Sequence, residues 1–231
     1  MTEPGRLTAV IFDCDGTLVD TEPLAWAAWA RVLAPSQVRI SAADIRRCTG
    51  RSFRATYDHF AEKAALPPPE MVEPELQRLV LAAIETHARA FPDAAAACRR
   101  LHERSIPMAV ASSSARVRLD LTLRTTGLDR YLEVTVAGDE VELSKPDPQL
   151  LLTAAARLGV DPSRCLVVED AAAGIDAARA AGMTSLAIRR DHNDASVSTM
   201  DADHVGDSLD QVDELLGSDA RYPTGHPREG G

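Results

Sequence analysis

The sequence lacks any apolar run long enough to span a bilayer, and its first residues, MTEPGR, contain no signal-peptide apolar core. We therefore expect a cytoplasmic protein. Aromatic side chains are also scarce, at 4% of the 231 residues, whereas alanine is abundant. Small side chains of this kind favour helices that pack closely against a sheet. The apolar content of 45% is ordinary for a globular protein and allows a sizeable core.

Patterns that form disulfides or bind soft metals are missing as well. The four cysteines, Cys14, Cys48, Cys98 and Cys165, stand far apart with no Cys-x-x-Cys pair, so we expect neither a disulfide framework nor a zinc site. The six histidines form no metal-binding pair at a spacing of four residues. The chain also has neither the phosphate loop of nucleoside triphosphatases nor a dinucleotide-binding glycine pattern.

The charge of the chain is one-sided, with a formal net charge of −10 at pH 7. Such a surface disfavours nonspecific binding to nucleic acid or to an anionic membrane, so we expect neither partner. An anionic substrate would need local compensation by a metal ion, by lysines or by helix N-termini. The sequence predicts no particular oligomeric state.

Apolar runs of strand length alternate with helical patterns, which predicts an α/β fold built on a Rossmann-like, doubly wound parallel sheet. The predicted strands span residues 7–12, 108–111, 134–137, 165–168, 184–188 and 204–205. The predicted helices between and after them span residues 93–104, 116–125, 148–158, 171–181 and 209–216. Gly127, Gly159 and Gly182 follow three of these helices, as is typical of helix ends.

A long alanine-rich stretch separates the first strand from the rest of this pattern. It predicts helices over residues 23–33, 42–49, 53–65 and 70–89 and contains no clear strand. We interpret residues 21–90 as an inserted α-helical cap domain, and residues 1–20 with 91–216 as the α/β catalytic core. Residues 217–231 are rich in glycine, proline and charge, which predicts a disordered tail.

The first predicted strand ends on two acids, Asp13 and Asp15, in the sequence VIFDCDGTLVD. The carboxyl ends of strands are where open α/β sheets bind ligands. One carboxylate there can act as a nucleophile while its neighbour handles protons, and both can hold a hard cation such as Mg²⁺. A calcium loop is the competing interpretation, but it fails because it needs an acid or amide at Thr17, a glycine at Leu18 and a glutamate at Leu24.

Polar residues also stand at the ends or starts of later predicted elements. Strand 108–111 ends in three serines, and a hydroxyl such as that of Ser112, with free backbone N–H groups before a helix, suits a phosphate oxygen. Helix capping by Ser113 or Ser114 is the alternative. Lys145, in SKPDP, stands just before a helix that prolines introduce, so it is held at the entry to an element and could neutralise both a phosphate and a carboxylate.

Strand 165–168 is the second apolar run that ends on paired acids, here Glu169 and Asp170. A helix N-cap at Asp170 is the alternative to a ligand role, and the two roles could coexist. Gly174, among alanines, would let the following helix lie close to the sheet.

These four segments, FDCDGTLVDTE, SSS, SKPDP and EDAAAGI, occur in the order of the four motifs of the haloacid dehalogenase-like superfamily, which the chain resembles up to its tail. The resemblance implies a phosphatase related to the β-phosphoglucomutase group. It implies Asp13 as the nucleophile that forms an aspartyl-phosphate and Asp15 as the acid and base. Ser112 and Lys145 would bind the phosphoryl group. Mg²⁺ would be held by Asp13, the backbone carbonyl of Asp15 and Asp170, with Glu169 close by.

The resemblance further implies that the cap closes over the site and selects a small phosphorylated metabolite, such as a sugar phosphate. Arg51 and Arg54, near the turn Gly50-Arg51-Ser52, are candidate substrate-binding residues, although a solvated basic face explains them equally well. Asp15 argues against the halide-releasing branch of the superfamily, whose members lack this second acid.

Two rival functions remain. A phosphosugar mutase of the β-phosphoglucomutase type would share the scaffold, but its cap histidine and arginine positions read Ala25 and Phe53 here, with Arg54 one residue late. These departures favour hydrolysis. A non-catalytic binding or regulatory protein would be the other class, but every predicted catalytic position is filled.

Overall fold

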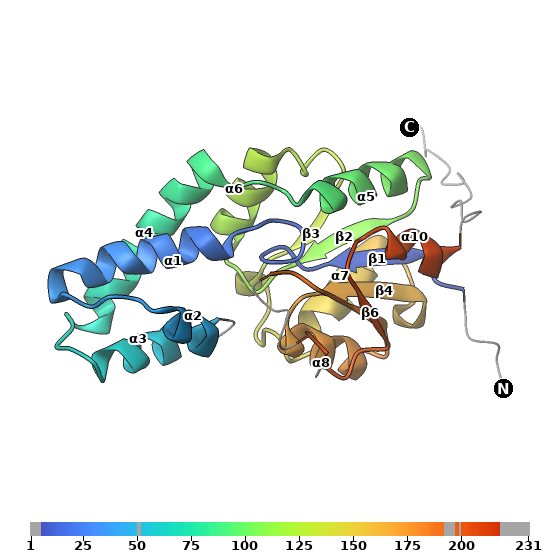
Figure 1. Ribbon diagram of the computed structural model, residues 1–231. Helices are drawn as coiled ribbons and strands as arrows, with labels where there is room; N and C mark the ends of the chain where they lie inside the picture. The colour runs from blue at the N-terminus through green and yellow to red at the C-terminus, as the bar shows by residue number, and fades with distance from the viewer. Residues whose placement is uncertain (1–5, 50–51, 192–196, 199, 218–231) are drawn as a thin grey trace.

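A parallel sheet forms the centre of the molecule (Figure 1). The computed structural model describes residues 6–49, 52–191, 197–198 and 200–217. Its sheet has six strands in the order β3-β2-β1-β4-β5-β6, and all neighbouring strands are parallel. The strands are β1 (Ala9–Phe12), β2 (Met108–Ala111), β3 (Val134–Val136), β4 (Cys165–Glu169), β5 (Thr184–Ile188) and β6 (His204–Gly206). The predicted α/β fold is confirmed.

The central strands are apolar because both of their faces are covered. Val10 and Phe12 of β1 belong to one buried cluster, and Ala9 and Ile11 belong to another on the opposite face. The first cluster includes side chains of α5 (Pro92–Glu103), α6 (Arg116–Thr126) and α10 (Gln211–Leu216). The second includes side chains of α7 (Gln149–Leu158) and α8 (Ala172–Ala180). The sheet is therefore doubly wound.

The register of the three central strands brings their carboxyl ends level. Phe12 of β1 is paired with Val110 of β2 on one side and with Val168 of β4 on the other. Asp13, Ala111 and Glu169 therefore follow at the same edge of the sheet. This is the edge at which open α/β sheets bind their ligands.

Four of the described α-helices lie between β1 and α5 in the chain, to one side of the sheet (Figure 1). They are α1 (Glu22–Leu33), α2 (Ala42–Cys48), α3 (Phe53–Ala61) and α4 (Pro69–His87). Trp29 of α1 stacks on Phe53 of α3 with ring centroids 5.7 Å apart, and α4 buries a stripe with a period of four residues, Val72, Leu76, Val80 and Ile84. None of the described helices combines the length and apolarity that crossing a membrane requires.

The third of these helices is shorter than predicted. The prediction of a helix to residue 65 is wrong, because α3 ends at Ala61. Beyond this point the backbone N–H groups of Lys63 and Ala64 both turn back to the carbonyl of Phe60. This turn brings the Lys63 ammonium to the buried carboxylate of Asp44 in α2.

The helical insertion between β1 and α5, for which we predict the bounds 21–90, joins the rest of the chain through two segments that lie side by side. The N–H of Asp20 donates to the carbonyl of Arg89 at 3.1 Å, and the N–H of Phe91 donates to the carbonyl of Leu18 at 3.0 Å. An antiparallel bridge joins Val19 to Ala90 between these two bonds. The insertion therefore enters and leaves at one place.

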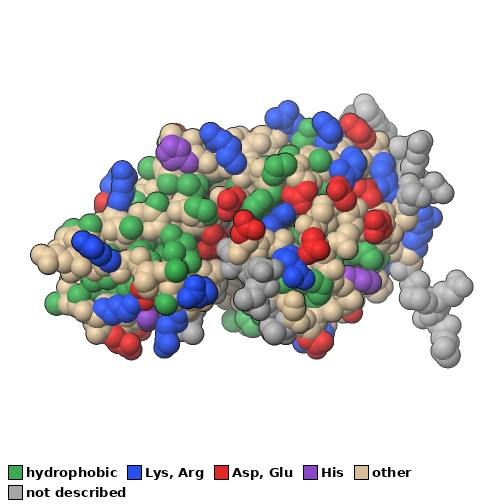
Figure 2. Space-filling view, in the orientation of Figure 1, with side chains coloured by type: hydrophobic (Ala, Val, Ile, Leu, Met, Phe, Trp, Pro, Cys, Tyr) green, Lys and Arg blue, Asp and Glu red, His purple; other side chains and the backbone are tan. Residues whose placement is uncertain are grey.

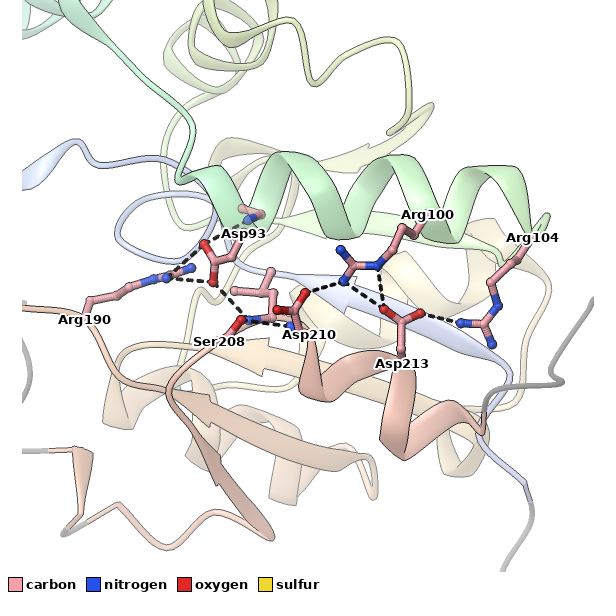
Figure 3. Close-up of polar contacts among 9 residues, drawn as sticks. Asp93, Arg100, Arg104, Arg190, Ser208, Asp210 and Asp213 are labelled. Atoms are coloured by element: carbon pink, nitrogen blue, oxygen red, sulfur yellow. Dashed lines mark hydrogen bonds and ion pairs between the residues drawn. The ribbon is translucent and has the colours of Figure 1, made fainter.

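The end of the chain is tied to α5 by charged side chains, and Figure 2 shows acidic and basic side chains gathered over α5 and α10. Arg100 of α5 bonds Asp210 and Asp213, and Arg104 bonds Asp213 (Figure 3). Arg104 also bonds the carbonyl of Gly217. Beyond Gly217, the predicted disordered tail lies outside the described residues.

Asp93, at the start of α5, joins three segments in the same region (Figure 3). Both of its carboxylate oxygens accept bonds from Nη1 of Arg190, at 2.9 and 3.1 Å. They also accept the backbone N–H groups of Ala94 at 2.9 Å and Leu209 at 3.0 Å. The side chain of Arg190 is only 8% exposed, so Asp93 is a partner of a buried cation.

We expect Asp93→Ala to lower the free energy of unfolding by about 3 kcal/mol, because it removes the carboxylate that bonds the buried Arg190 side chain and accepts the backbone N–H groups of Ala94 and Leu209. Asp210→Ala is the matched control, since the Asp210 side chain is 67% exposed and its loss should cost about 0–1 kcal/mol. Urea denaturation of both variants measures the difference. Equal losses would contradict the assignment of Asp93 as the stronger tie.

Candidate active site

Three buried carboxylates meet at the carboxyl edge of the sheet. One oxygen each of Asp13, Glu169 and Asp170 lies within 4.8 Å of the others. Asp13 directly follows β1, and its N–H donates to the carbonyl of Val168 in β4 at 2.9 Å. Glu169 ends β4 and Asp170 follows it. The level strand ends thus bring together acids that are more than 150 residues apart in the sequence.

Lys145 reaches into this cluster from the loop before α7. Its Nζ donates to Oδ1 of Asp13 at 2.6 Å, to Oε1 of Glu169 at 2.7 Å and to the carbonyl of Ala111 at 2.7 Å. All three N–H bonds of the ammonium are used, and the side chain is 5% exposed. Lys145 is therefore a buried cation of the site and not a surface lysine.

Burial has the largest effect on the pKa values of two acids in this cluster, Asp13 and Glu169. Burial raises the pKa of Asp13 well above its usual range, and Glu169 and Asp170 add to the effect, although Lys145 opposes it. Burial likewise raises the pKa of Glu169 against the influence of Lys145. Burial alone would lower the pKa of Lys145, but Asp13 and Glu169 outweigh it and raise that pKa. The Lys145 ammonium is therefore charged. It is shared between Asp13 and Glu169, so one positive charge faces more than one acid.

Asp15 lies on the more open side of the site. Its Oδ1 accepts bonds from Thr21 Oγ1 at 2.8 Å and from Nη2 of Arg118 at 2.7 Å, and its Oδ2 accepts a bond from Ser114 Oγ at 2.7 Å. Burial alone would raise the pKa of Asp15, but Arg118 and the two hydroxyls together lower it. Asp13 and Asp15, separated by one residue, thus have pKa values shifted in opposite directions.

Asp170 is held by the loop that follows β1. Thr17 donates its hydroxyl to Oδ1 of Asp170 at 2.8 Å, and Nη2 of Arg190 donates to the carbonyl of Thr17 at 2.9 Å. The alternative role of Asp170 as a helix N-cap is wrong, because α8 begins at Ala172 and its N-cap residue is Ala171.

Ser112 is buried at the end of β2, where its hydroxyl accepts the N–H of Ser114 at 3.1 Å. Neither Ser113 nor Ser114 caps the following helix, because the N-cap of α6 is Ala115. The capping interpretation is therefore wrong for both serines. Ser114, through its bond to Asp15, is the serine with a direct contact to a predicted catalytic residue.

Glycine lets two elements approach the site closely. A Cβ atom at Gly174 of α8 would overlap the carboxylate of Glu169, and a Cβ atom at Gly138 would overlap the carbonyl of Ser113. Both carboxylate oxygens of Glu169 already accept bonds, one from Lys145 and the other from the N–H groups of Asp170 and Ala171 at 3.0 Å. Gly174 thus leaves room for the Glu169 conformation that orients Lys145.

Of the two predicted substrate-binding arginines, the structure describes Arg54, which contacts no residue of the acidic cluster in its described interactions. Arg51 lies outside the described residues. Arg54 is exposed, pairs with Asp58 at 3.0 Å and lies over the ring of Tyr57 in the same helix. Its role in binding stays a prediction.

A divalent cation fits the donor set. Three carboxylates and the single ammonium of Lys145 give the cluster a net charge of −2. Hard oxygen ligands of this kind suit Mg²⁺. Asp13 and Asp170 are the residues that would hold the ion, since the oxygens of Glu169 already accept bonds from Lys145 and from backbone N–H groups.

Sequence reasoning missed Arg118, Ser114 and Thr21 as partners of Asp15. Arg118 lies in the first turn of α6, where the helix dipole disfavours a cation. An arginine in the first turn of a helix that follows a sheet strand is the signal that could have found it.

Comparison with known proteins agrees with this arrangement. A family model for haloacid dehalogenase-like hydrolases matches residues 7–182. The chain belongs to this family. As a member, it is 32% identical over 201 residues to validoxylamine A 7'-phosphate phosphatase of Streptomyces hygroscopicus subsp. limoneus, covering 83% of this chain and 90% of the relative. It is 33% identical to fructose-1-phosphate phosphatase of Escherichia coli K12, covering 80% of this chain and 97% of that protein.

Solved structures of the family share the fold. A haloacid dehalogenase family hydrolase from Deinococcus radiodurans R1, solved with bound phosphate and sodium, superimposes with a TM-score of 0.78. The two sequences are 32% identical, and the alignment covers 92% of this chain and 96% of the other. The similarity therefore extends over the insertion as well as the sheet.

Proposed function

We propose that this hydrolase is a Mg²⁺-dependent phosphatase that cleaves a small phosphorylated metabolite of the sugar phosphate type. Phosphoric monoester hydrolysis is the activity of the two named relatives, whose substrates are small phosphorylated compounds. The observation that carries the proposal is the pairing of Asp13 with Lys145, beside two further acids and one residue away from Asp15. Such a site offers a nucleophile, charge neutralisation and a separate proton donor.

In the first step a carboxylate oxygen of Asp13 bonds to phosphorus as the bond from phosphorus to the ester oxygen breaks. Asp15 gives its proton to that leaving oxygen. A phosphoryl group beside Asp15 favours the protonated acid, because like charge raises the pKa of a carboxyl. In the second step Asp15 takes a proton from water, the water oxygen bonds to phosphorus, and the bond to Asp13 breaks to release phosphate.

Other groups of the site stabilise charge and hold geometry. Lys145 neutralises charge on the phosphoryl oxygens and on Asp13 together. Bound Mg²⁺ would add Lewis-acid stabilisation of the phosphoryl oxygens. Ser112, buried at the end of β2, would bind a phosphoryl oxygen through its hydroxyl. The helical insertion, residues 21–90, would act as a cap that excludes bulk water and selects the substrate.

The test is a panel of phosphorylated metabolites with p-nitrophenyl phosphate as a general probe, each assayed for released phosphate with Mg²⁺ and with a chelator. We expect Mg²⁺-dependent release, with the highest kcat/KM on a sugar phosphate or a related compound. No release from any compound of the panel would favour the non-catalytic binding protein.

We expect Mg²⁺ to stabilise the protein and Asp170→Asn to abolish this stabilisation, because the ion neutralises the excess charge of the cluster. At 100 times its dissociation constant, an ion that binds only the folded state adds about 2.7 kcal/mol. Thermal unfolding with increasing Mg²⁺ measures the effect without any turnover. Asp176→Asn, an exposed position in α8, is the control that should keep it. The same Mg²⁺ response in Asp170→Asn would remove Asp170 from the metal site.

The contacts of Phe53 and Arg54 support hydrolysis over the mutase alternative. The Phe53 ring stacks on Trp29 inside the insertion, and Arg54 pairs with Asp58. We expect β-glucose 1-phosphate with a trace of the bisphosphate to give free phosphate or no reaction. Accumulation of glucose 6-phosphate without release of phosphate would show that the chain is a mutase.

A further inference from the structure

Arg118 is a charged residue at the site that the reaction described above does not use. It comes from α6, whereas the five other charged groups of the site follow β1, end or follow β4, or precede α7. Its Nη2 bonds Oδ1 of Asp15 at 2.7 Å, across 103 positions of sequence. Among the predicted catalytic residues, Asp15 is thus the one that Arg118 bonds in the described structure.

The exposure of the side chains shows on which side of the site this pair lies. The side chains of Glu169 and Lys145 are 2% and 5% exposed, so they form the closed side. Those of Asp15 and Arg118 are 23% and 29% exposed, so they form the open side. A phosphoryl group held by Lys145 would leave the rest of the substrate on the open side, where Asp15 and Arg118 lie.

The placement of Arg118 is unfavourable for a residue that only stabilises the fold. It occupies the first turn of α6 together with Arg116, and this turn contains no acidic residue that would suit the helix dipole. Its Nε is buried and has no hydrogen-bond partner among the described residues. Buried donors are normally paired, and leaving one unpaired lowers the stability of the fold. A placement that lowers stability points to a role of Arg118 in the site.

We propose that Arg118 is a positioning residue for phosphoryl transfer, which holds the Asp15 carboxyl group on the open side of the site, where the ester oxygen leaves. A guanidinium is suited to this because its planar fork restricts the orientation of the carboxylate. Thr21 and Ser114 hold the same group from two other directions. The inference rests on the proposed role of Asp15 as the proton donor.

A comparison of two aryl phosphates of similar shape tests how well the enzyme delivers a proton to the leaving oxygen. The leaving group of p-nitrophenyl phosphate is stable as an anion and needs little protonation, whereas that of phenyl phosphate is a stronger base and needs more. We expect Arg118→Met to raise the ratio of kcat for p-nitrophenyl phosphate to kcat for phenyl phosphate by about tenfold, because misplaced Asp15 delivers its proton poorly. Arg118→Lys should recover part of this loss.

Two further variants make the outcome decisive. Arg124→Met removes the same charge from an exposed position of α6 and should leave the ratio unchanged. Asp15→Asn should raise the ratio at least as much as Arg118→Met does. If Asp15→Asn raises the ratio and Arg118→Met slows both substrates equally, Arg118 is only structural and the inference is wrong. If Asp15→Asn leaves the ratio unchanged, the proposed role of Asp15 is wrong and the role of Arg118 falls with it. Arg118→Lys serves as the test if Arg118→Met does not fold.

Discussion

Asp13→Asn is expected to reduce turnover by at least about 10⁴-fold while the protein stays folded, because an amide cannot attack phosphorus as a carboxylate does. The substitution keeps the shape of the side chain, and its amide oxygen can still accept a bond from Lys145. Steady-state hydrolysis of p-nitrophenyl phosphate measures the loss, and circular dichroism checks the fold. A rapid acid quench of the unaltered enzyme should trap phosphate on Asp13.

Asp20→Asn is the matched control for this experiment. Asp20 belongs to the same VIFDCDGTLVD segment, but its side chain is exposed and its N–H serves the linker bond to Arg89. The control removes the same charge and should keep the turnover of the unaltered enzyme. If Asp13→Asn retained turnover within about tenfold, the aspartyl-phosphate route would be wrong.

Lys145→Met is expected to impair both turnover and stability. The methionine has a similar length but no charge, so it leaves Asp13 and Glu169 buried without their cation. Removing one partner of a buried ion pair costs about 3–5 kcal/mol, and loss of a group that stabilises phosphoryl charge lowers kcat by about 10³-fold. Denaturation without Mg²⁺ and kinetics with Mg²⁺ measure the two effects separately.

The loss of stability in Lys145→Met should depend on pH in a defined direction. Without Lys145, the pKa values of Asp13 and Glu169 in the folded protein rise further above their values in the unfolded chain. The folded state then binds more protons, so the free energy of unfolding falls as the pH rises through the folded pKa values. The deficit should be larger at about pH 8 than at about pH 5. A deficit that is constant with pH would mean that these acids are not the cause.

Lys63→Met is the control, because Lys63 is the only lysine in the chain besides Lys145. It is 40% exposed and pairs with Asp44 in the helical insertion, away from the acidic cluster. We expect it to leave kcat unchanged. A similar fall in kcat for both lysine variants would show that the loss does not come from the contacts of Lys145.

The part of this site that could be predicted lies at the ends of strands. Apolar runs that stop on Asp13 and Glu169 mark a sheet edge, and parallel strands bring such edges together whatever the length of chain between them. Lys145 could be predicted because its position just before a helix restricts where its side chain can lie. The sheet and its order of elements follow from the same alternating pattern.

The part that could not be predicted depends on contacts between side chains. Arg118 contacts Asp15 only after α6 has packed on the sheet. No local sequence pattern specifies how α6 is oriented on the sheet. The length of α3 depends likewise on the turn that brings Lys63 to Asp44, which overrides the helical pattern of residues 62–65. For the same reason the sequence suggested capping serines where the structure uses Ala115 as the N-cap.

The paired linkers at Val19 and Ala90 have a consequence for how this enzyme could diverge from its relatives. Both ends of the insertion leave the core at one place. Helices of the insertion can therefore be lengthened, shortened or replaced without changing the positions of β1 and β2 in the sheet. The sequence of residues 21–90 can therefore change while Asp13, Lys145 and Asp170 keep their positions. Selection on the proposed role of residues 21–90 as a cap can thus act almost independently of selection on the chemistry within a single chain.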